Sequence, residues 1–140
     1  MDYPDNVIPH PNAAEPPIAN ERIFAADRTL SDHGQHSLVQ AFDAVAIISA
    51  TDIRGRITYV NERFVKISGY SEAELLGQTH RIVNSGHHPT SFFKEMWQTI
   101  IAGGSWQGEI KDRAKDGSYY WVDTIIVPSK NSQGFIDGYV

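Results

Sequence analysis

The segment from Trp106 to Pro128 constrains the fold more than any other, because it encodes two long strands joined by a tight turn. The first strand is predicted over residues 106–114. The second is predicted over residues 119–127, where aromatic and β-branched residues are concentrated. Lys115-Asp116-Gly117-Ser118 supplies the turn between them, with Gly117 free to adopt a positive φ angle. This segment therefore predicts a long antiparallel hairpin.

Further strands flank this hairpin in the sequence. Residues 44–50 form a continuous apolar strand suited to the centre of a sheet, and residues 56–60 form the next strand after a turn at residues 52–55. After the hairpin, Gln133-Gly134 turns the chain into a final strand over residues 135–140. The helices are expected between these two groups of strands.

Capping residues mark the helices in the middle of the chain. Asn61 is placed to cap a short helix, and Ser71, with Glu74 three residues later, forms a capping box for the next helix. Thr90 is placed to cap a longer helix over residues 91–102, whose apolar residues form one wide stripe. Strands at both ends with helices between them predict an α+β fold, in which helices cover one face of an antiparallel sheet.

The N-terminal part of the chain has a different character. Residues 1–20 hold five of the seven prolines and cannot bury enough surface to offset their ordering entropy, so we expect a disordered tail. Residues 21–42 predict a short helix capped by Thr29 or Ser31. This helix either packs on the domain that follows, residues 43–140, or pairs two protomers. Its apolar residues at helical spacing are Leu38, Val39 and Phe42.

Composition excludes several classes of function. With 12 basic and 17 acidic residues, the chain has a formal net charge of −5 and no basic surplus to neutralise nucleic-acid phosphates. It has no cysteine, which excludes disulfides, thiolate catalysis and cysteine metal sites. The sequence shows neither a signal peptide nor an apolar run of the ~20 residues that span a bilayer, so we expect a cytoplasmic protein.

No catalytic or metal-binding pattern stands out. The dinucleotide fingerprint, the P-loop, GxSxG and HExxH are absent, and we expect no enzymatic activity in this chain. His87 and His88 are adjacent, which favours a polar loop over a zinc site completed by His80. Three aspartates of the hairpin lie among lysines and arginines, which predicts a solvated strand edge rather than acid–base chemistry. They are Asp112, Asp116 and Asp123.

Together these segments resemble a PAS domain, a small ligand-sensing and signalling module, over about residues 42–140. The resemblance rests on Thr51-Asp52 followed by residues 55–61, on Phe64 with residues 68–71, and on the long hairpin. It implies a five-stranded antiparallel sheet in spatial order 2-1-5-4-3, with helices on one face and an N-terminal helical extension. It also implies the N-terminal input part of a larger bacterial signalling protein. A homodimer through the N-terminal helix and the sheet face is implied as well.

Within that family the chain is most similar to the FAD-binding group found in aerotaxis receptors and in the redox sensor that regulates nitrogen-fixation genes. The similarity lies in residues 77–86, Met96-Trp97, residues 106–109 and residues 113–117. It implies non-covalent FAD and a response to redox state or oxygen, or to light without a cysteine to trap it. The implied cofactor-binding residues are Ser49, Asn61, Phe64, His80, Ile82, Asn84, Trp97, Trp106, Asp112 and Thr124.

The resemblance also implies individual roles. Ser49 falls near the flavin N5, Asn61 at an asparagine important for FAD binding, and Trp97 near the isoalloxazine ring. Two residues depart from the pattern, because His80 stands where a relative has a glutamate and Asp112 where relatives have an asparagine. That asparagine can pair with the flavin N3–H and O4. An ionised aspartate accepts but cannot donate a hydrogen bond, so Asp112 would repel O4 unless it is protonated or turned away.

Two alternatives to flavin stay open. Haem could be the ligand, with His80 as the one candidate axial residue, because residues 91–102 contain no histidine. The domain could instead bind no cofactor and serve only dimerisation or partner docking. Aromatic side chains would then fill its interior themselves. These are Phe64, Phe93, Trp97 and Trp106.

Overall fold

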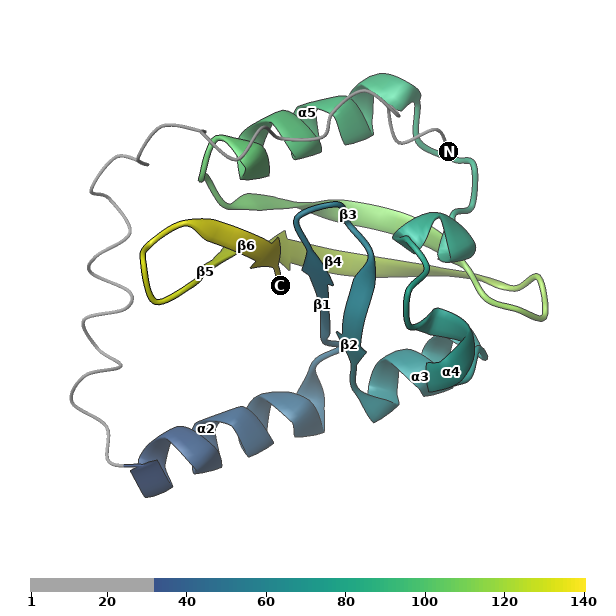
Figure 1. Cartoon of the computed structure of the whole chain (residues 1–140). Helices are drawn as coiled ribbons and strands as arrows, with labels where there is room; N and C mark the ends of the chain where they lie inside the picture. Colours follow the sequence, from purple (N-terminus) through teal and green to yellow (C-terminus); the bar gives the residue numbers. More distant parts are fainter. Residues whose placement is uncertain (1–31) are drawn as a thin grey trace.

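Along the chain, strands come before and after a group of helices, as the sequence pattern predicted (Figure 1). The computed structural model describes residues 32–140, so the predicted tail and the caps at Thr29 and Ser31 lie outside the described residues. The elements are α2 (Asp32–Val45), β1 (Ser49–Asp52), β2 (Ile57–Val60), α3 (Glu62–Ser68), α4 (Glu72–Leu75), the 3₁₀ helix η3 (His80–Val83), α5 (Thr90–Ile101), β3 (Trp106–Arg113), β4 (Tyr119–Ile126), β5 (Pro128–Lys130) and β6 (Ile136–Tyr139).

All the strand pairs are antiparallel, but they divide into two sheets rather than the single one expected. One sheet has the order β2-β1-β6-β5, and the other is the β3–β4 hairpin. The division falls where β4 ends, because Pro128 has no N–H to donate to a ladder. Val127 still exchanges both backbone hydrogen bonds with Val140, at 2.9 and 2.8 Å. With β5 as the continuation of β4, the strands follow the predicted spatial order 2-1-5-4-3.

Helices and strands meet in one apolar core. Its centre is a cluster of buried side chains from β2, α3, α4 and η3, against which Ile82 packs. On α5 the buried side chains are Phe93, Met96 and Ile100. Helix α5 lies along the β3–β4 hairpin (Figure 1), and Phe92 meets the Trp106 ring edge-on at 5.4 Å. The predicted α+β architecture is therefore confirmed. The cluster consists of Ile57, Val60, Phe64, Leu75 and Val83.

Two helix starts follow the predicted capping, and a third does not. The Asn61 side chain accepts from the Phe64 N–H, and Ser71 forms the complete capping box with Glu74. The prediction for Thr90 was wrong, because α5 begins at that residue and Pro89 is its N-cap, without a side-chain hydrogen bond. Proline is suited to such a helix start because its fixed φ angle matches the turn and it lacks an N–H.

The strand predicted over residues 44–50 was also wrong in its start. Helix α2 continues to Val45, and β1 begins only at Ser49. A short apolar run satisfies a buried strand and the apolar stripe of a helix equally well, so periodicity alone cannot separate them. Here the helix takes the first part of the run and the strand takes the last.

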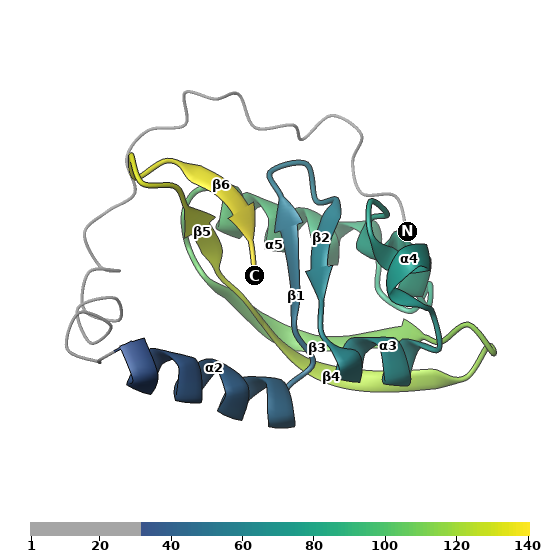
Figure 2. The ribbon, with the colours of Figure 1, turned by 60° about the horizontal axis from the view of Figure 1, so that its bottom comes forward.

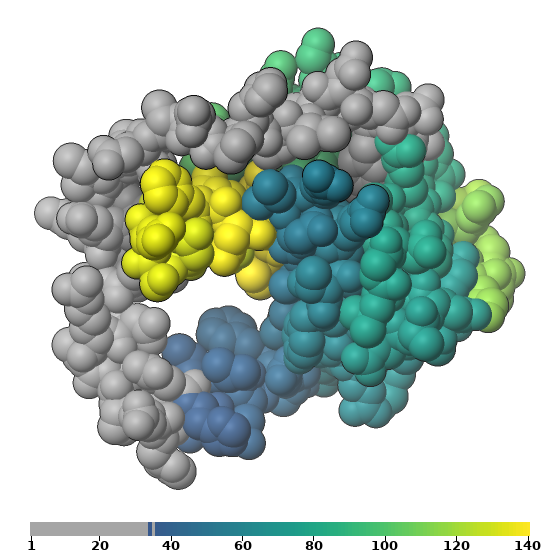
Figure 3. Space-filling view, viewed as in Figure 1, coloured from purple at the N-terminus to yellow at the C-terminus, as the bar shows by residue number. Residues whose placement is uncertain are grey.

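Helix α2 stands apart from β5 and β6 (Figures 2 and 3). Its apolar side chains are largely exposed, with Phe42 at 52% and Val45 at 75%. Its contacts with the domain come instead from Asp43, which accepts from the Tyr59 hydroxyl and the Asn61 amide, both at 3.5 Å. Of the two roles left open for this helix, the structure does not show packing of its apolar stripe on the domain.

Candidate ligand-binding site

Ser49 and His80 meet where the first strand faces the 3₁₀ helix. Ile57 donates its N–H to the Gln78 carbonyl, and Gly77 donates back to the Ile57 carbonyl, both at 2.8 Å. These bonds hold the segment before η3 against β2 and bring His80 to the start of β1. The Ser49 Oγ and His80 Nε2 atoms lie 3.0 Å apart, within hydrogen-bonding distance.

The imidazole of His80 is neutral at physiological pH. Burial lowers its pKa from 6.5 to about 4, because no nearby charge offsets the loss of hydration. The Phe64 ring meets it edge-on at 5.9 Å. A neutral imidazole has one N–H and one lone pair, so the bond to Ser49 can run in either direction. The pair can therefore present either a hydroxyl donor or a hydroxyl acceptor to a bound molecule.

Asp112 lies on the inner face of β3, directly opposite Tyr120 of β4. Burial raises the pKa of its carboxyl from 3.8 to about 7. Within residues 32–140, no hydrogen bond or ion pair reaches this carboxyl, although the Asp112 backbone forms an isolated bridge with Asn84. The expectation of a solvated edge was thus wrong for Asp112, and it was confirmed for the exposed Asp116 and Asp123.

An aromatic and small-residue surface continues along the same face of the hairpin. Successive residues of a strand alternate between faces, so Trp106, Gly108 and Asp112 share one face. Gly108 allows the Trp106 indole to lie flat, because a Cβ there would be 2.6 Å from the ring. Thr124 is the cross-strand partner of Gly108. The hairpin therefore presents an indole, a hydroxyl and a carboxyl on one surface.

Asn61 has its hydrogen-bonding groups occupied by three backbone groups and by the Asp43 carboxylate. Its Oδ1 accepts from the N–H groups of Ile48 and Phe64, at 3.0 and 3.1 Å, and its Nδ2 donates to the Ala46 carbonyl at 2.8 Å. The side chain therefore ties the α2–β1 connection to the start of α3. Any part that Asn61 plays in ligand binding is a positioning role.

Trp97 packs at the turn between β1 and β2. Its indole lies so close to Gly55 that a Cβ there would be 2.9 Å from the ring, and it meets Tyr139 of β6 edge-on at 5.6 Å. The structure therefore brings Ser49, Phe64 and His80 together and gives Trp97 contacts with other elements.

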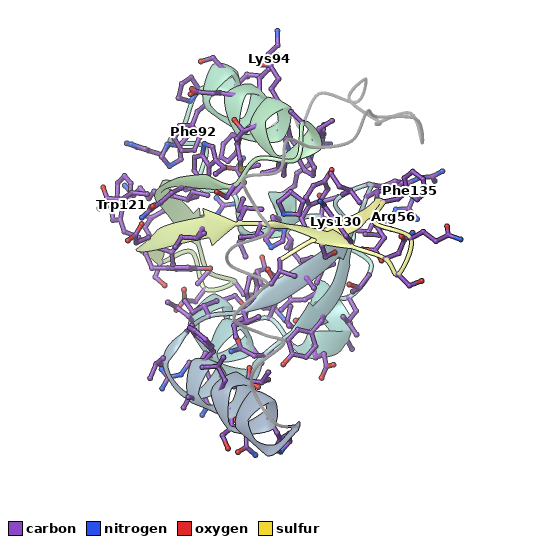
Figure 4. The ribbon with its side chains drawn as sticks, turned by 90° about the vertical axis from the view of Figure 1, so that its left-hand side faces the viewer. Arg56, Phe92, Lys94, Trp121, Lys130 and Phe135 are labelled. Carbon is purple, nitrogen blue, oxygen red and sulfur yellow. The ribbon has the colours of Figure 1, made fainter. Side chains whose placement is uncertain are left out.

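Sequence reasoning missed a set of side chains that fasten the loop before α5 to the edge of β3. Ser85 donates its hydroxyl to the Lys111 carbonyl, and the Lys111 N–H donates to His88 Nε2 at 2.9 Å. The His88 ring stacks on Phe92 at 4.2 Å. The unpaired backbone groups of an edge strand were the available signal, because buried edges need partners. Phe92 and Trp121 mark this side of the molecule, opposite Arg56 and Phe135 (Figure 4).

Residues 32–140 contain no group of three histidine or acidic side chains that could hold a metal ion. His87 and His88 instead contact each other edge-on, with ring centroids 5.0 Å apart. In the same range, no helix has the length and apolar character needed to cross a membrane.

Comparison with known proteins identifies the family to which this chain belongs. A family model described as PAS fold matches residues 57–140, and the chain belongs to the PAS family. It is 41% identical over 97 residues to a nitrogen fixation regulatory protein of Klebsiella pneumoniae, covering 69% of this chain and 20% of that protein. It is 40% identical over 98 residues to the aerotaxis receptor of Escherichia coli, covering 70% and 19%. The chain thus spans about a fifth of the length of these relatives.

Solved structures agree with this assignment. The PAS domain of a protein from Colwellia psychrerythraea superposes with a TM-score of 0.64 and 26% identity, over 75% of this chain and 90% of that one. The dark structure of the blue-light photoreceptor Aureochrome1 LOV gives a TM-score of 0.63 at 22% identity, over 74% and 78% of the two chains. The second likeness concerns the fold alone. The predicted family is confirmed, and the chain is a PAS sensory domain.

Proposed function

We propose that the chain is a cytoplasmic input domain that binds FAD non-covalently and responds to redox state or oxygen, with light as a second possible stimulus. The observation that carries the proposal is the half-buried, uncharged pair formed by Ser49 and His80. A flavin N5 accepts a hydrogen bond when oxidised and donates one when reduced. The Ser49–His80 pair can match both states, because it can reverse its own direction of donation.

The reversal involves only a hydroxyl rotation and a proton position on the imidazole. Facing an acceptor, Ser49 donates its hydroxyl proton outward and accepts from the Nε2–H of His80. Facing a donor, Ser49 accepts and turns its proton toward His80 Nε2, and His80 then carries its proton on Nδ1. Because β1 lies between β2 and β6, a change at Ser49 acts at the middle of the four-stranded sheet.

The inner face of the hairpin supports the same ligand. The Trp106 indole offers a flat apolar surface, and Thr124 and Asp112 offer polar groups on the same face. A flavin needs this combination, because its ring is flat and apolar along one side and carries donors and acceptors along another. The indole of Trp106 and the polar groups of Thr124 and Asp112 therefore fit a flavin.

The absorption spectrum of the freshly purified protein tests this proposal. The two-band near-ultraviolet and blue spectrum of oxidised flavin, released as FAD on denaturation, is the expected result. A single intense Soret band would instead mean haem, with His80 as the ligand to substitute. A colourless protein that FAD cannot reconstitute would overturn the flavin proposal and leave a dimerisation or docking module.

A second proposal concerns pairing of two copies through α2. The observation that favours it is the exposed apolar stripe of that helix, which the domain leaves uncovered. The exposed fractions are 48% for Leu38, 59% for Val39, 52% for Phe42 and 75% for Val45. Since the matched relatives are about five times longer, we also propose that the output lies in another part of the natural protein. A histidine kinase, a cyclic-dinucleotide enzyme or a chemoreceptor would suit this input.

A further inference from the structure

Asp112 carries a half-buried carboxyl on the inner face of β3. Its sequence neighbours Lys111 and Arg113 belong to the opposite face of β3, where they pair with Trp121 and Tyr119. The Lys111 Nζ atom lies 4.7 Å from the Tyr119 ring centroid. Within residues 32–140 no positive side chain contributes to the pKa shift of Asp112, and burial favours its neutral form.

The groups that do face Asp112 are uncharged at neutral pH. Tyr120 lies across the ladder, and its own pKa is raised by burial and then by the proximity of Asp112 and Tyr70. Asn84 approaches from the segment after η3 through its backbone. On η3, His80 is neutral, as derived above, and Arg81 does not contribute to the pKa shift of Asp112. Within the described residues, none of these groups gives the carboxyl of Asp112 a hydrogen bond.

A neutral carboxyl has one acceptor oxygen and one O–H donor side by side, in the same layout as a primary amide. The pyrimidine edge of a flavin presents acceptor, donor and acceptor in turn, at O2, N3–H and O4. A neutral carboxyl can pair with the N3–H and O4 together. An ionised carboxylate would place an oxygen acceptor against another acceptor.

We propose that Asp112 recognises the pyrimidine edge of the flavin as a neutral carboxylic acid, so that flavin binding takes up one proton whenever the free protein is ionised at this position. The inference rests on the proposed function. The carbonyl oxygen of Asp112 accepts from N3–H, and the Asp112 O–H donates to O4. The proton that Asp112 takes up comes from solvent. The site therefore couples flavin affinity to pH through one side chain of β3.

The coupling has a defined size. Below the pKa of about 7 the carboxyl is already protonated, and affinity is independent of pH at this position. Above it, each pH unit lowers the protonated fraction about tenfold, so the Kd for FAD rises by up to about tenfold per unit. Asp112→Asn removes the titration and keeps one donor and one acceptor, so its Kd stays flat and at high pH lies below that of the wild type.

The test measures the Kd for FAD by fluorescence quenching from about pH 6 to about pH 9, a range that brackets the titration of Asp112. Asp123→Asn is the matched control, because it removes the same charge from the exposed face of β4. We expect the wild type and Asp123→Asn to lose affinity above neutrality and Asp112→Asn to stay flat. Calorimetry of the wild type in buffers of different ionisation enthalpy measures proton uptake directly, without relying on any variant.

The possible outcomes separate this inference from the proposed function. A wild-type Kd that does not change with pH, with no proton uptake, overturns the role of Asp112 and leaves flavin binding intact. The same rise in Asp112→Asn as in the wild type overturns it as well. Absence of FAD binding by the wild type and by both variants at every pH overturns the proposed function itself, and this inference with it.

Discussion

His80 and Asp112 are both held in their neutral forms by burial, and their effects on stability oppose each other. For His80 the pKa falls from 6.5 to about 4 on folding, so between these values the unfolded chain binds the extra proton and stability rises with pH. For Asp112 the pKa rises from 3.8 to about 7, so the folded chain binds the extra proton and stability falls with pH. Over the shared window the two slopes cancel.

Single substitutions separate the two pH dependences of the free energy of unfolding. In Asp112→Asn we expect the free energy of unfolding to rise by about 3 kcal/mol more than in the wild type between pH 4 and pH 6.5, because the opposing slope of Asp112 is removed and that of His80 remains. In His80→Gln we expect it to fall relative to the wild type over the same window, because the slope of Asp112 is then no longer opposed by that of His80. Urea unfolding at several pH values measures both slopes. Equal, flat profiles in the wild type and in Asp112→Asn would contradict the burial of His80.

Ser49 is the side chain through which the proposed redox signal would enter the sheet. Ser49→Ala should retain FAD with at most about a tenfold loss of affinity, because one hydrogen bond contributes about 1 kcal/mol. The variant should lose the difference in amide hydrogen exchange of β1 between oxidised and reduced protein. Ser49→Thr keeps the hydroxyl and serves as the control. An undiminished redox difference in Ser49→Ala would remove Ser49 from the signalling route.

The Nε2 atom of His88 makes one of the two side-chain hydrogen bonds that join the loop before α5 to the edge of β3. His88→Phe keeps an aromatic ring against Phe92 and removes the acceptor for the Lys111 N–H. A buried donor left unpaired costs about 1–3 kcal/mol, so we expect a loss of stability of that size and faster hydrogen exchange at the Lys111 amide. His87→Phe is the matched control, because His87 contributes a ring contact with Trp121 but no such bond. Equal effects of the two substitutions would argue against the bond.

His88 also makes this junction sensitive to acid. Burial, and then the neighbouring His87, lower the pKa of His88, so its contribution to stability is complete above pH 6.5 and is lost as the pH falls toward the lowered value. Protonation places a hydrogen on Nε2, which can then no longer accept from Lys111. The His88→Phe variant should lack this part of the acid sensitivity.

The features that could be predicted from sequence are those that depend on residues close together in the chain. The caps at Asn61 and Ser71 and the β3–β4 hairpin depend on residues close together in the chain, and they were predicted correctly. Ser49 and His80 are 31 positions apart, so their contact depends on how α4 and η3 fold back on β2. The burial of Asp112 depends on which hairpin face the helices cover, and a polar, charged strand gave no sign of it. Family resemblance named these residues without showing their protonation or partners.

Helix α2 offers a contact surface beyond the domain. Asp43 faces the domain, and helical spacing places the apolar stripe on another side, toward solvent. Exposed apolar stripes of this kind usually mark a contact surface, because water contact with them is unfavourable. A second copy of the same helix offers a complementary surface, since pairing would bury both stripes at once. The stripe is therefore the part of the molecule on which assembly is expected to depend.

Charge placed on that stripe tests the assembly. Leu38→Glu combined with Phe42→Glu should convert a dimer to a monomer, since each buried leucine or phenylalanine contributes about 1.5–3 kcal/mol and the new carboxylates would face each other. Gln40→Glu adds charge to the opposite side of α2, where Gln40 contacts His36, and should leave the mass unchanged. Light scattering reports the mass of each protein. A monomeric wild type, or a double variant that keeps the dimer mass, would show that α2 does not pair two copies and that its stripe is covered by another part of the longer protein.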